Sequence, residues 1–352
     1  MTHAAPPHDT RRMQGLTCAL LGAVAFSGKA ILAKLMYKLG ADPFAVVGMR
    51  MAMAFPLFLA MVWWSARRGP ASPDAVGPLS RRQWWQIIGL GFSGYYLAST
   101  LDFVGLKYIS ASLERAILYL NPSIVLVLSA LWLGKRIQRA QVVAMAISYI
   151  GVVIVWLHDW DVASLVSTRA QGMSPMAAIA TGSVCVFFSA VAYAIYLMGS
   201  GQLVQRMGSM RLVGLASCAA CFMAVAQWLA LYLISKGQTG NVAQLPLQVW
   251  VLSLINATAC TVLPVWLVMR GVQLIGASMA SQAGMIGPLS TIWMAAWWLD
   301  EPVTWRLMVG TAAVLVGVFV LAKVNQQGAP SPSQSPLQPD REPDGRPKRA
   351  NA

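Results

Sequence analysis

Residues 105–133 carry the sequence GLKYISASLERAILYLNPSIVLVLSALWL, and residues 271–299 carry GVQLIGASMASQAGMIGPLSTIWMAAWWL. The two stretches align when 166 is added to each residue number of the first, and this register continues without a gap to Gly151–Val152 against Gly317–Val318. Identical positions include Gly105 with Gly271, Ile109 with Ile275, Ala111–Ser112 with Ala277–Ser278, Pro122 with Pro288, and Trp132–Leu133 with Trp298–Leu299. Self-similarity over such a length indicates that the chain contains two copies of one unit.

The composition places both copies in a lipid bilayer. Of 352 residues, 57% are apolar and only 11% are charged, whereas soluble domains carry about 25% charged residues. The net charge of +14 does not indicate nucleic-acid binding, because the charges fall between long apolar runs, as in membrane proteins. The composition therefore argues against a cytosolic enzyme, a disordered protein and a nucleic-acid module.

Apolar runs long enough to cross a bilayer, which takes about 20 residues per helix, occur ten times. Their limits are 14–37, 43–64, 84–104, 110–133, 139–157, 176–199, 212–235, 248–269, 277–299 and 304–323. They are apolar on every side and do not alternate as the strands of a membrane barrel would. The predicted fold class is an all-α integral membrane protein with ten transmembrane helices.

Each copy holds five runs, so the second copy enters the membrane from the opposite side. We therefore predict two inverted five-helix repeats related by a pseudo-two-fold axis in the membrane plane. Seventeen Lys and Arg residues lie in the segments on the side of the two termini, and five lie in the segments on the other side. Because cytoplasmic loops are enriched in Lys and Arg, both termini are expected in the cytoplasm.

This count divides the chain into five parts. They are a cytoplasmic tail over 1–13, the first repeat over 14–157, an external linker over 158–175, the second repeat over 176–323 and a C-terminal tail over 324–352. The C-terminal tail is rich in Pro, Ser, Gln and charge, a composition typical of disorder.

The sequence offers little catalytic or cofactor chemistry. The five cysteines all lie inside apolar runs, and the CxxC of Cys218 and Cys221 is interpreted as helix packing and not as a redox or metal pair. No His, Cys or carboxylate cluster has metal-ligand spacing, and no phosphate-binding glycine motif or nucleophile elbow is present. We expect no metal, no cofactor and no catalytic residue, and no cleavable signal peptide.

Several short motifs resemble a known family. They are GLKYISASLE at 105–114, LNP at 120–122 and LWLGKR at 131–136 in the first repeat, and GVQLIGAS at 271–278, GP at 287–288 and WLDEP at 298–302 in the second. Together they resemble the EamA-like branch of the drug/metabolite transporter superfamily, from about residue 14 to residue 323. Family members usually have an acidic residue after the fourth and ninth spans; Asp300–Glu301 fits this pattern and Gly134–Lys135 departs from it. The resemblance implies a ten-helix carrier of the bacterial inner membrane, often an exporter of amino acids or other metabolites.

Charged residues inside the spans form one band in the first repeat. They share a depth in the half of the bilayer away from the termini: Lys29, Lys34, Arg50, Asp102, Glu114 and Arg115. The second repeat has no equivalent, since the positions that match Asp102, Glu114 and Arg115 are Val268, Ala280 and Ser281. We interpret Lys29 as a site for a substrate carboxylate and Glu114 as a site for an amino group or a coupled proton, with Arg50 undecided. The alternative is a structural network pairing Asp102 with Arg50 or Glu114 with Lys29. Lys34 and Arg115 are expected to reach the outer surface.

Two prolines are expected to kink the fourth and ninth spans. Pro122 frees the carbonyl of Leu118 and Pro288 frees that of Gly284, and such carbonyls can line a cavity. Asn121 shares a helix face with Glu114, and Gln282 lies at a similar depth, so both are candidate binding residues, with a packing kink as the alternative. The aromatic residues within spans are best explained by bundle packing, and among them Tyr96 and Trp266 are the best cavity candidates.

The sequence thus predicts a secondary transporter that works by alternating access around a midplane cavity between inverted repeats. A membrane enzyme acting on a lipid-linked substrate, with Asp102 and Glu114 as its acid and base, and a passive small-solute channel are the alternatives. The expected partners are a small-molecule solute and the lipid bilayer, with no nucleic acid, and the sequence leaves a homodimer open.

Overall fold

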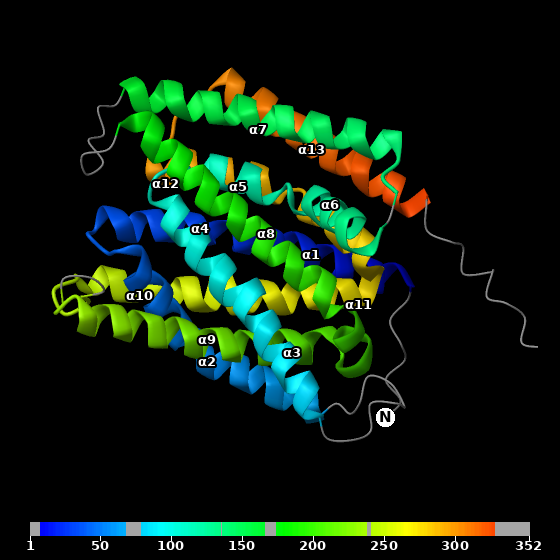
Figure 1. Ribbon diagram of the computed structural model, residues 1–352, viewed down its shortest axis with the longest axis horizontal. Coiled ribbons are helices and arrows are strands. Elements are labelled where there is room, and N and C mark those ends of the chain that lie inside the picture. The colour runs from blue at the N-terminus through cyan, green and yellow to red at the C-terminus, as the bar shows by residue number, and fades with distance from the viewer. Residues whose placement is uncertain (1–7, 68–78, 135, 166–173, 238–240, 328–352) are drawn as a thin grey trace, which may run out of the picture.

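The computed structural model describes residues 8–67, 79–134, 136–165, 174–237 and 241–327, and these residues form a helical bundle without strands (Figure 1). The first repeat contains α1 (His8–Lys38), α2 (Pro43–Arg67), α3 (Arg81–Gly91), η2 (Phe92–Leu97), α4 (Ala98–Leu106), α5 (Ala111–Leu118), α6 (Asn121–Leu133) and α7 (Arg139–Leu165). The second repeat contains α8 (Pro175–Met207), α9 (Ser209–Ile234), α10 (Leu247–Ala257), η3 (Thr258–Val262), α11 (Leu263–Gly284), α12 (Gly287–Leu299) and α13 (Trp305–Gln327).

The all-helical membrane fold is confirmed. Nine helical segments of the described chain are long and apolar enough to cross a bilayer. The tenth predicted run, 277–299, consists of the end of α11 and the whole of α12. It separates from the preceding span at Gly276, which has φ 79° and so interrupts the helical backbone of α11.

The two repeats share irregularities at equivalent positions. The π-helical turn η2 begins at Phe92 and its counterpart η3 begins at Thr258, 166 residues later. The break between α5 and α6 matches the break between α11 and α12 by the same shift. Finally, Gly134 and Asp300 both end their helices in the left-handed conformation, with φ 64° and 60°. These shared departures from regular helix identify the units as copies of one structure.

Helices of the two repeats pair across the bundle. In Figure 1, α7 and α13 form one edge, α2 and α9 form the opposite edge, and α1 runs along α11 between them. The helix α4 packs along α8 in the same way. The pseudo-two-fold axis exchanges α1 with α8 and α11 with α4. The pair of α1 with α11 is therefore equivalent to the pair of α8 with α4, and we call these two the inner pairs.

Close contacts in these inner pairs depend on glycine. A Cβ on Gly105 would lie 2.6 Å from the carbonyl oxygen of Gly182, where α4 meets α8. At the equivalent crossing of α11 with α1, a Cβ on Gly271 would lie 3.1 Å from the carbonyl oxygen of Gly15. Glycine at these crossings lets the backbones approach closely, as is common between membrane helices.

Some helix ends differ from the sequence prediction. The fifth span continues eight residues beyond 157, to Leu165, because His158 and Asp159 are buried and hydrogen-bonded and so need no water. The first part of the predicted 158–175 linker is therefore helical. Helices also extend to Met207, past the predicted limit at 199, and to Gln327, past the limit at 323. Residues 1–7, 166–173 and 328–352 of the predicted tails and linker lie outside the described residues.

Candidate functional site

A cavity of about 380 Å³ lies between the two repeats. Its walls come from α1, α2, η2, α4, α5 and α6 of the first repeat and from α8, α9, η3, α11 and α12 of the second. The cavity is centred near the middle of the spans, where Phe26, Ser189 and Gly287 line it. Its lining also includes Val213, near the start of α9, and Met269 of α11, on the side of the bundle that holds the start of α1 and the end of α13 (Figure 1). We call this end the termini side.

An ion pair lies in the cavity wall. The Nζ of Lys29 in α1 is 2.5 Å from Oδ2 of Asp102 in α4, and both side chains are almost fully buried. The ammonium also lies 5.4 Å from the ring centre of Phe26 and 5.5 Å from that of Phe103. The pairing of Lys29 differs from both predicted pairings, Asp102 with Arg50 and Glu114 with Lys29. Buried carboxylate and ammonium groups each lose hydration, and the short contact offsets part of that cost.

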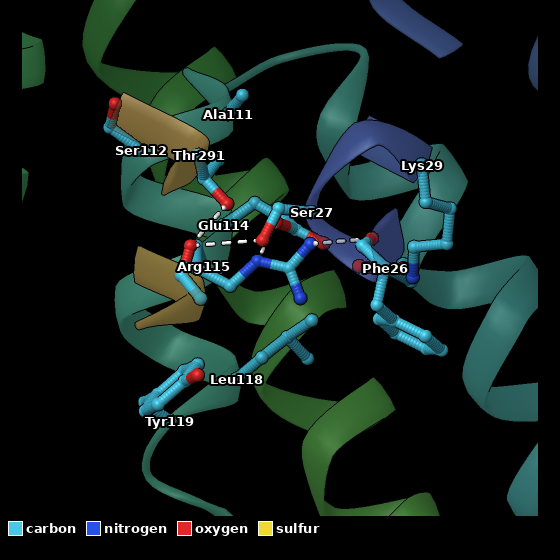
Figure 2. Close-up of polar contacts among 12 residues, drawn as sticks. Phe26, Ser27, Lys29, Ala111, Ser112, Glu114, Arg115, Leu118, Tyr119 and Thr291 are labelled. Carbon is cyan, nitrogen blue, oxygen red and sulfur yellow. Dashed lines mark hydrogen bonds and ion pairs between the residues drawn. The ribbon is translucent and has the colours of Figure 1, made fainter. Parts of the chain in front are cut away.

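Glu114 and Arg115 are adjacent in α5, but only the side chain of Arg115 lines the cavity. Glu114 is 0% exposed and does not line the cavity, and its carboxyl group lies beside that of Asp102. Its Oε2 lies 3.7 Å from Nε of Arg115. The Arg115 side chain lines the cavity and donates from Nη2 to the carbonyl oxygen of Phe26 at 3.4 Å (Figure 2). The expectation that Arg115 reaches the outer surface is therefore wrong: neighbouring helix positions point about 100° apart, and this one faces inward.

Arg50 is the third cation in the wall. It is 2% exposed, and its guanidinium lies 4.5 Å from the ring centre of Phe103. Its Nη1 donates to the hydroxyl of Thr261 at 3.4 Å, while Nε and Nη2 have no hydrogen-bond partner. No ion pair to Arg50 occurs among the described residues. A charge held in a membrane span costs about 2.5–3.5 kcal/mol on the insertion scale, so an uncompensated one requires an explanation.

The helix breaks face each other across the repeat interface. Leu118, Asn121, Gly284 and Gly287 all line the cavity. The predicted free carbonyls, however, have partners: the Asn121 side-chain amide donates to Leu118 at 2.8 Å, and the Tyr119 hydroxyl donates to Gly284 at 2.5 Å. The hydrogen bond from Tyr119 to Gly284 therefore joins the two repeats at their helix breaks. The Oδ1 of Asn121 has no hydrogen-bond partner.

The remaining predicted candidates lie away from the cavity. Tyr96 faces Phe92, with ring centres 5.5 Å apart. Trp266 packs against the hydrophobic core, and Gln282 is exposed on the bundle exterior. Of the predicted site residues, the structure therefore brings Lys29, Arg50 and Asn121 to the cavity and leaves Tyr96, Glu114, Trp266 and Gln282 outside its lining.

Tyr95 and Tyr193 line the cavity instead of Tyr96. Both contact Tyr196, with ring centres 5.0 and 5.6 Å away. Tyr95 and Tyr96 differ by one position in the π-helical turn η2, whose altered winding sets which ring faces inward. Hydropathy contains no signal for that turn, so the sequence could not distinguish the two.

Polar contacts join the repeats at the far end of the bundle, opposite the termini side. Glu301 of the second repeat accepts from the backbone amide of Ala111 at 3.0 Å and from the hydroxyl of Ser112 at 3.3 Å. Lys34 lies 3.7 Å from the same carboxylate, and its side chain is 22% exposed. We call these contacts of Glu301 with Ala111, Ser112 and Lys34 the Glu301 bridge. Beside it, Asp159 accepts from the amide and hydroxyl of Ser110, the N-cap of α5.

Comparisons with known proteins agree with this architecture. The model of the EamA-like transporter family matches residues 13–157 and 180–323. An uncharacterized transporter of Bacillus subtilis, YcbK, is 30% identical over 305 residues, covering 85% of this chain and 90% of that protein. An uncharacterized transporter of Archaeoglobus fulgidus is 28% identical over 118 residues, 32% of this chain and 37% of its own. One crystal structure with 17% identity aligns with a TM-score of 0.53 over 91% of this chain and 98% of its own, which supports the fold alone.

Proposed function

Since the chain belongs to the EamA-like transporter family and is a membrane transporter, we propose that it is a secondary carrier that exports a small metabolite across the bacterial inner membrane. The observation that supports this most strongly is the cavity between inverted repeats, with buried charges in its wall. Inverted repeats can rock against each other, so that a shared midplane site opens to one side and then to the other.

Alternating access has support from the asymmetry of the two ends. The cavity extends toward the termini side, where Val213 and Met269 line it. At the opposite end, the Glu301 bridge holds α5 of the first repeat to the segment after α12 of the second. We interpret this arrangement as an inward-facing state in which the bridge closes the outer side, and the outward-facing state requires the bridge to open.

Glu114 is the proposed coupling group. Its carboxyl group is fully buried and lies beside that of Asp102, so the two acids can hold a proton between them. The charged groups around it are Arg115, Asp102 and Lys29, which connect its charge to the cavity wall. Uptake of a proton at Glu114 removes the negative charge that faces Arg115, and this links proton binding to the cavity.

The membrane-enzyme alternative has less support. Its proposed acid and base were Asp102 and Glu114, but Asp102 is bound to Lys29 and Glu114 is closed off from the cavity. Within the described residues no group of three or more His, Cys, Asp or Glu side chains is placed to hold a metal ion.

Counterflow in proteoliposomes tests the proposal. Vesicles containing the purified protein are loaded with one unlabelled metabolite, and uptake of the labelled form is followed against protein-free vesicles. Transient accumulation above equilibrium indicates a carrier, whereas linear non-saturable flux indicates a channel. Absence of any exchange across a broad panel of amino acids and organic acids, with the protein folded, contradicts the proposal.

A further inference from the structure

The charges around the cavity do not balance. Three buried cations, Lys29, Arg50 and Arg115, line it, and two carboxylates lie beside them. Asp102 is paired with Lys29 at 2.5 Å, and Glu114 lies 3.7 Å from Arg115. Arg50 has no carboxylate within 4 Å in the described part of the chain, and two of its nitrogens have no hydrogen-bond partner. One negative charge is therefore missing from the wall.

We propose that the cavity binds a small organic anion whose carboxylate pairs with Arg50. The inference rests on the proposed function, because it names the class of solute carried. A guanidinium presents its N–H groups in a planar fork that matches a carboxylate, and Nε with Nη2 is one of the two edges on which it binds both oxygens. In Arg50 that edge is the one without partners, and the Arg50 side chain lines the cavity.

The same wall disfavours a substrate with an ammonium group. Asp102 is the one acidic side chain among the described residues that line the cavity, and Lys29 already occupies it. An amino acid or amine would bring its positive charge near Lys29, Arg50 and Arg115 without a free carboxylate to meet it. The solute class is therefore a carboxylate without an amino group. This class leaves out the amino acids that the family resemblance includes.

The rest of the cavity fits an apolar body. From the charged wall toward the termini side, its lining includes Phe58, Val213, Val265 and Met269. The volume of about 380 Å³ falls within the range of about 300–1,000 Å³ for small-molecule sites. An inorganic anion would leave this apolar space unfilled, whereas an aryl or alkyl carboxylate would fill it.

Three compounds that share one apolar body test the charge preference. They are 3-phenylpropanoate, an anion; phenylalanine, a zwitterion; and phenethylamine, a cation. Binding to the full-length protein in detergent is measured by calorimetric titration, and aliphatic carboxylates from acetate to octanoate extend the series. We expect the carboxylates to bind, with affinity rising with apolar size, and the amine and the amino acid to bind at least tenfold more weakly.

Substitutions at Arg50 test the site itself. Arg50→Met removes the cation and should weaken 3-phenylpropanoate binding about 30-fold or more, since breaking one buried charge pair typically has at least that effect. Arg50→Lys retains the charge without the fork and should bind with intermediate affinity. Arg306→Met, which removes an exposed arginine on the far side of the bundle, is the matched control and should bind as the wild type does.

Several outcomes overturn the inference. They are carboxylate binding that is unchanged in Arg50→Met, phenylalanine or phenethylamine binding as tightly as 3-phenylpropanoate, saturation by chloride or phosphate alone, and no binding of any carboxylate in the series. These results leave the proposed function standing if counterflow of another solute persists. Carboxylates that bind at Arg50 but give no counterflow would support the site and contradict the transport proposal.

Discussion

Lys29 and Asp102 form a buried ion pair of 2.5 Å that joins α1 to α4 within the cavity wall. The pair lies between Phe26 and Phe103, and Phe103 also contacts the guanidinium of Arg50. The ring of Phe103 thus contacts both Lys29, whose charge is neutralised by Asp102, and Arg50, whose charge is not neutralised by a carboxylate. Because only one of the two cations is paired, substitutions at Lys29 and at Arg50 should have opposite effects on stability.

Lys29→Met should destabilise the protein strongly, because it leaves the carboxylate of Asp102 buried without a counter-charge. The expected loss is about 3–5 kcal/mol. The double variant Lys29→Met with Asp102→Leu should recover most of that loss, since no unpaired charge remains. Thermal unfolding in detergent measures both. If the single and double variants are equally unstable, the pair does not act as a unit.

Arg50→Met should leave the thermal stability unchanged or raise it, because the wild-type cation has no paired carboxylate. Lys29→Met is measured in the same unfolding assay for comparison. A structural cation such as Lys29 lowers the stability when it is removed, whereas a cation that serves ligand binding does not. A loss of stability comparable to that of Lys29→Met would mean that Arg50 holds the fold and is not reserved for a ligand.

Glu114→Gln should abolish coupling to a pH gradient while counterflow remains. The substitution conserves shape and removes both the negative charge beside Arg115 and the ability to gain or lose a proton. The measurement is export from proteoliposomes with and without an imposed pH gradient, beside counterflow at uniform pH. Asp161→Asn, which neutralises an exposed carboxylate paired with Arg306, is the control and should retain the response to the gradient. An undiminished response in Glu114→Gln contradicts the coupling role.

Gly105→Ala should destabilise the crossing of α4 with α8, because the new Cβ would lie 2.6 Å from the backbone oxygen of Gly182. Overpacking of this kind costs about 1–3 kcal/mol. Gly89→Ala in α3 is the matched control, since a Cβ there meets nothing within 4 Å. Thermal unfolding should show a lower midpoint for the first variant and an unchanged or higher one for the second. Equal midpoints would mean that the crossing tolerates a side chain.

The sequence predicts the fold well because hydropathy and the internal repeat can both be read directly from the order of residues. Hydropathy locates the spans, and the shift of 166 residues that aligns Pro122 with Pro288 also aligns the helix breaks that the structure contains. Of the predicted band of charges, Lys29, Arg50, Asp102 and Arg115 line one cavity.

The partners of those charges depend on helix rotation, which hydropathy does not fix. The sequence suggests Glu114 as one possible ion-pair partner of Lys29, whereas the structure pairs Lys29 with Asp102. Arg115 follows Glu114 directly, yet one side chain lines the cavity and the other is closed off. These helices are apolar on nearly every side, so no amphipathic stripe determines which side of a helix faces its neighbour. Close packing determines it instead, as where Gly105 meets Gly182.

The central claim is that the two repeats alternate around one cavity, so that the Glu301 bridge must open in each cycle. The direct measurement is counterflow by the variant Ser112→Cys with Glu301→Cys, built with the five native cysteines replaced and assayed before and after treatment with a short bifunctional thiol reagent. We predict that a crosslink through disulfide bonds to this reagent stops transport and that a reductant restores it, while each single-cysteine variant retains transport after the same treatment. Transport that continues at the same rate with the crosslink formed would contradict alternating access through this end of the bundle.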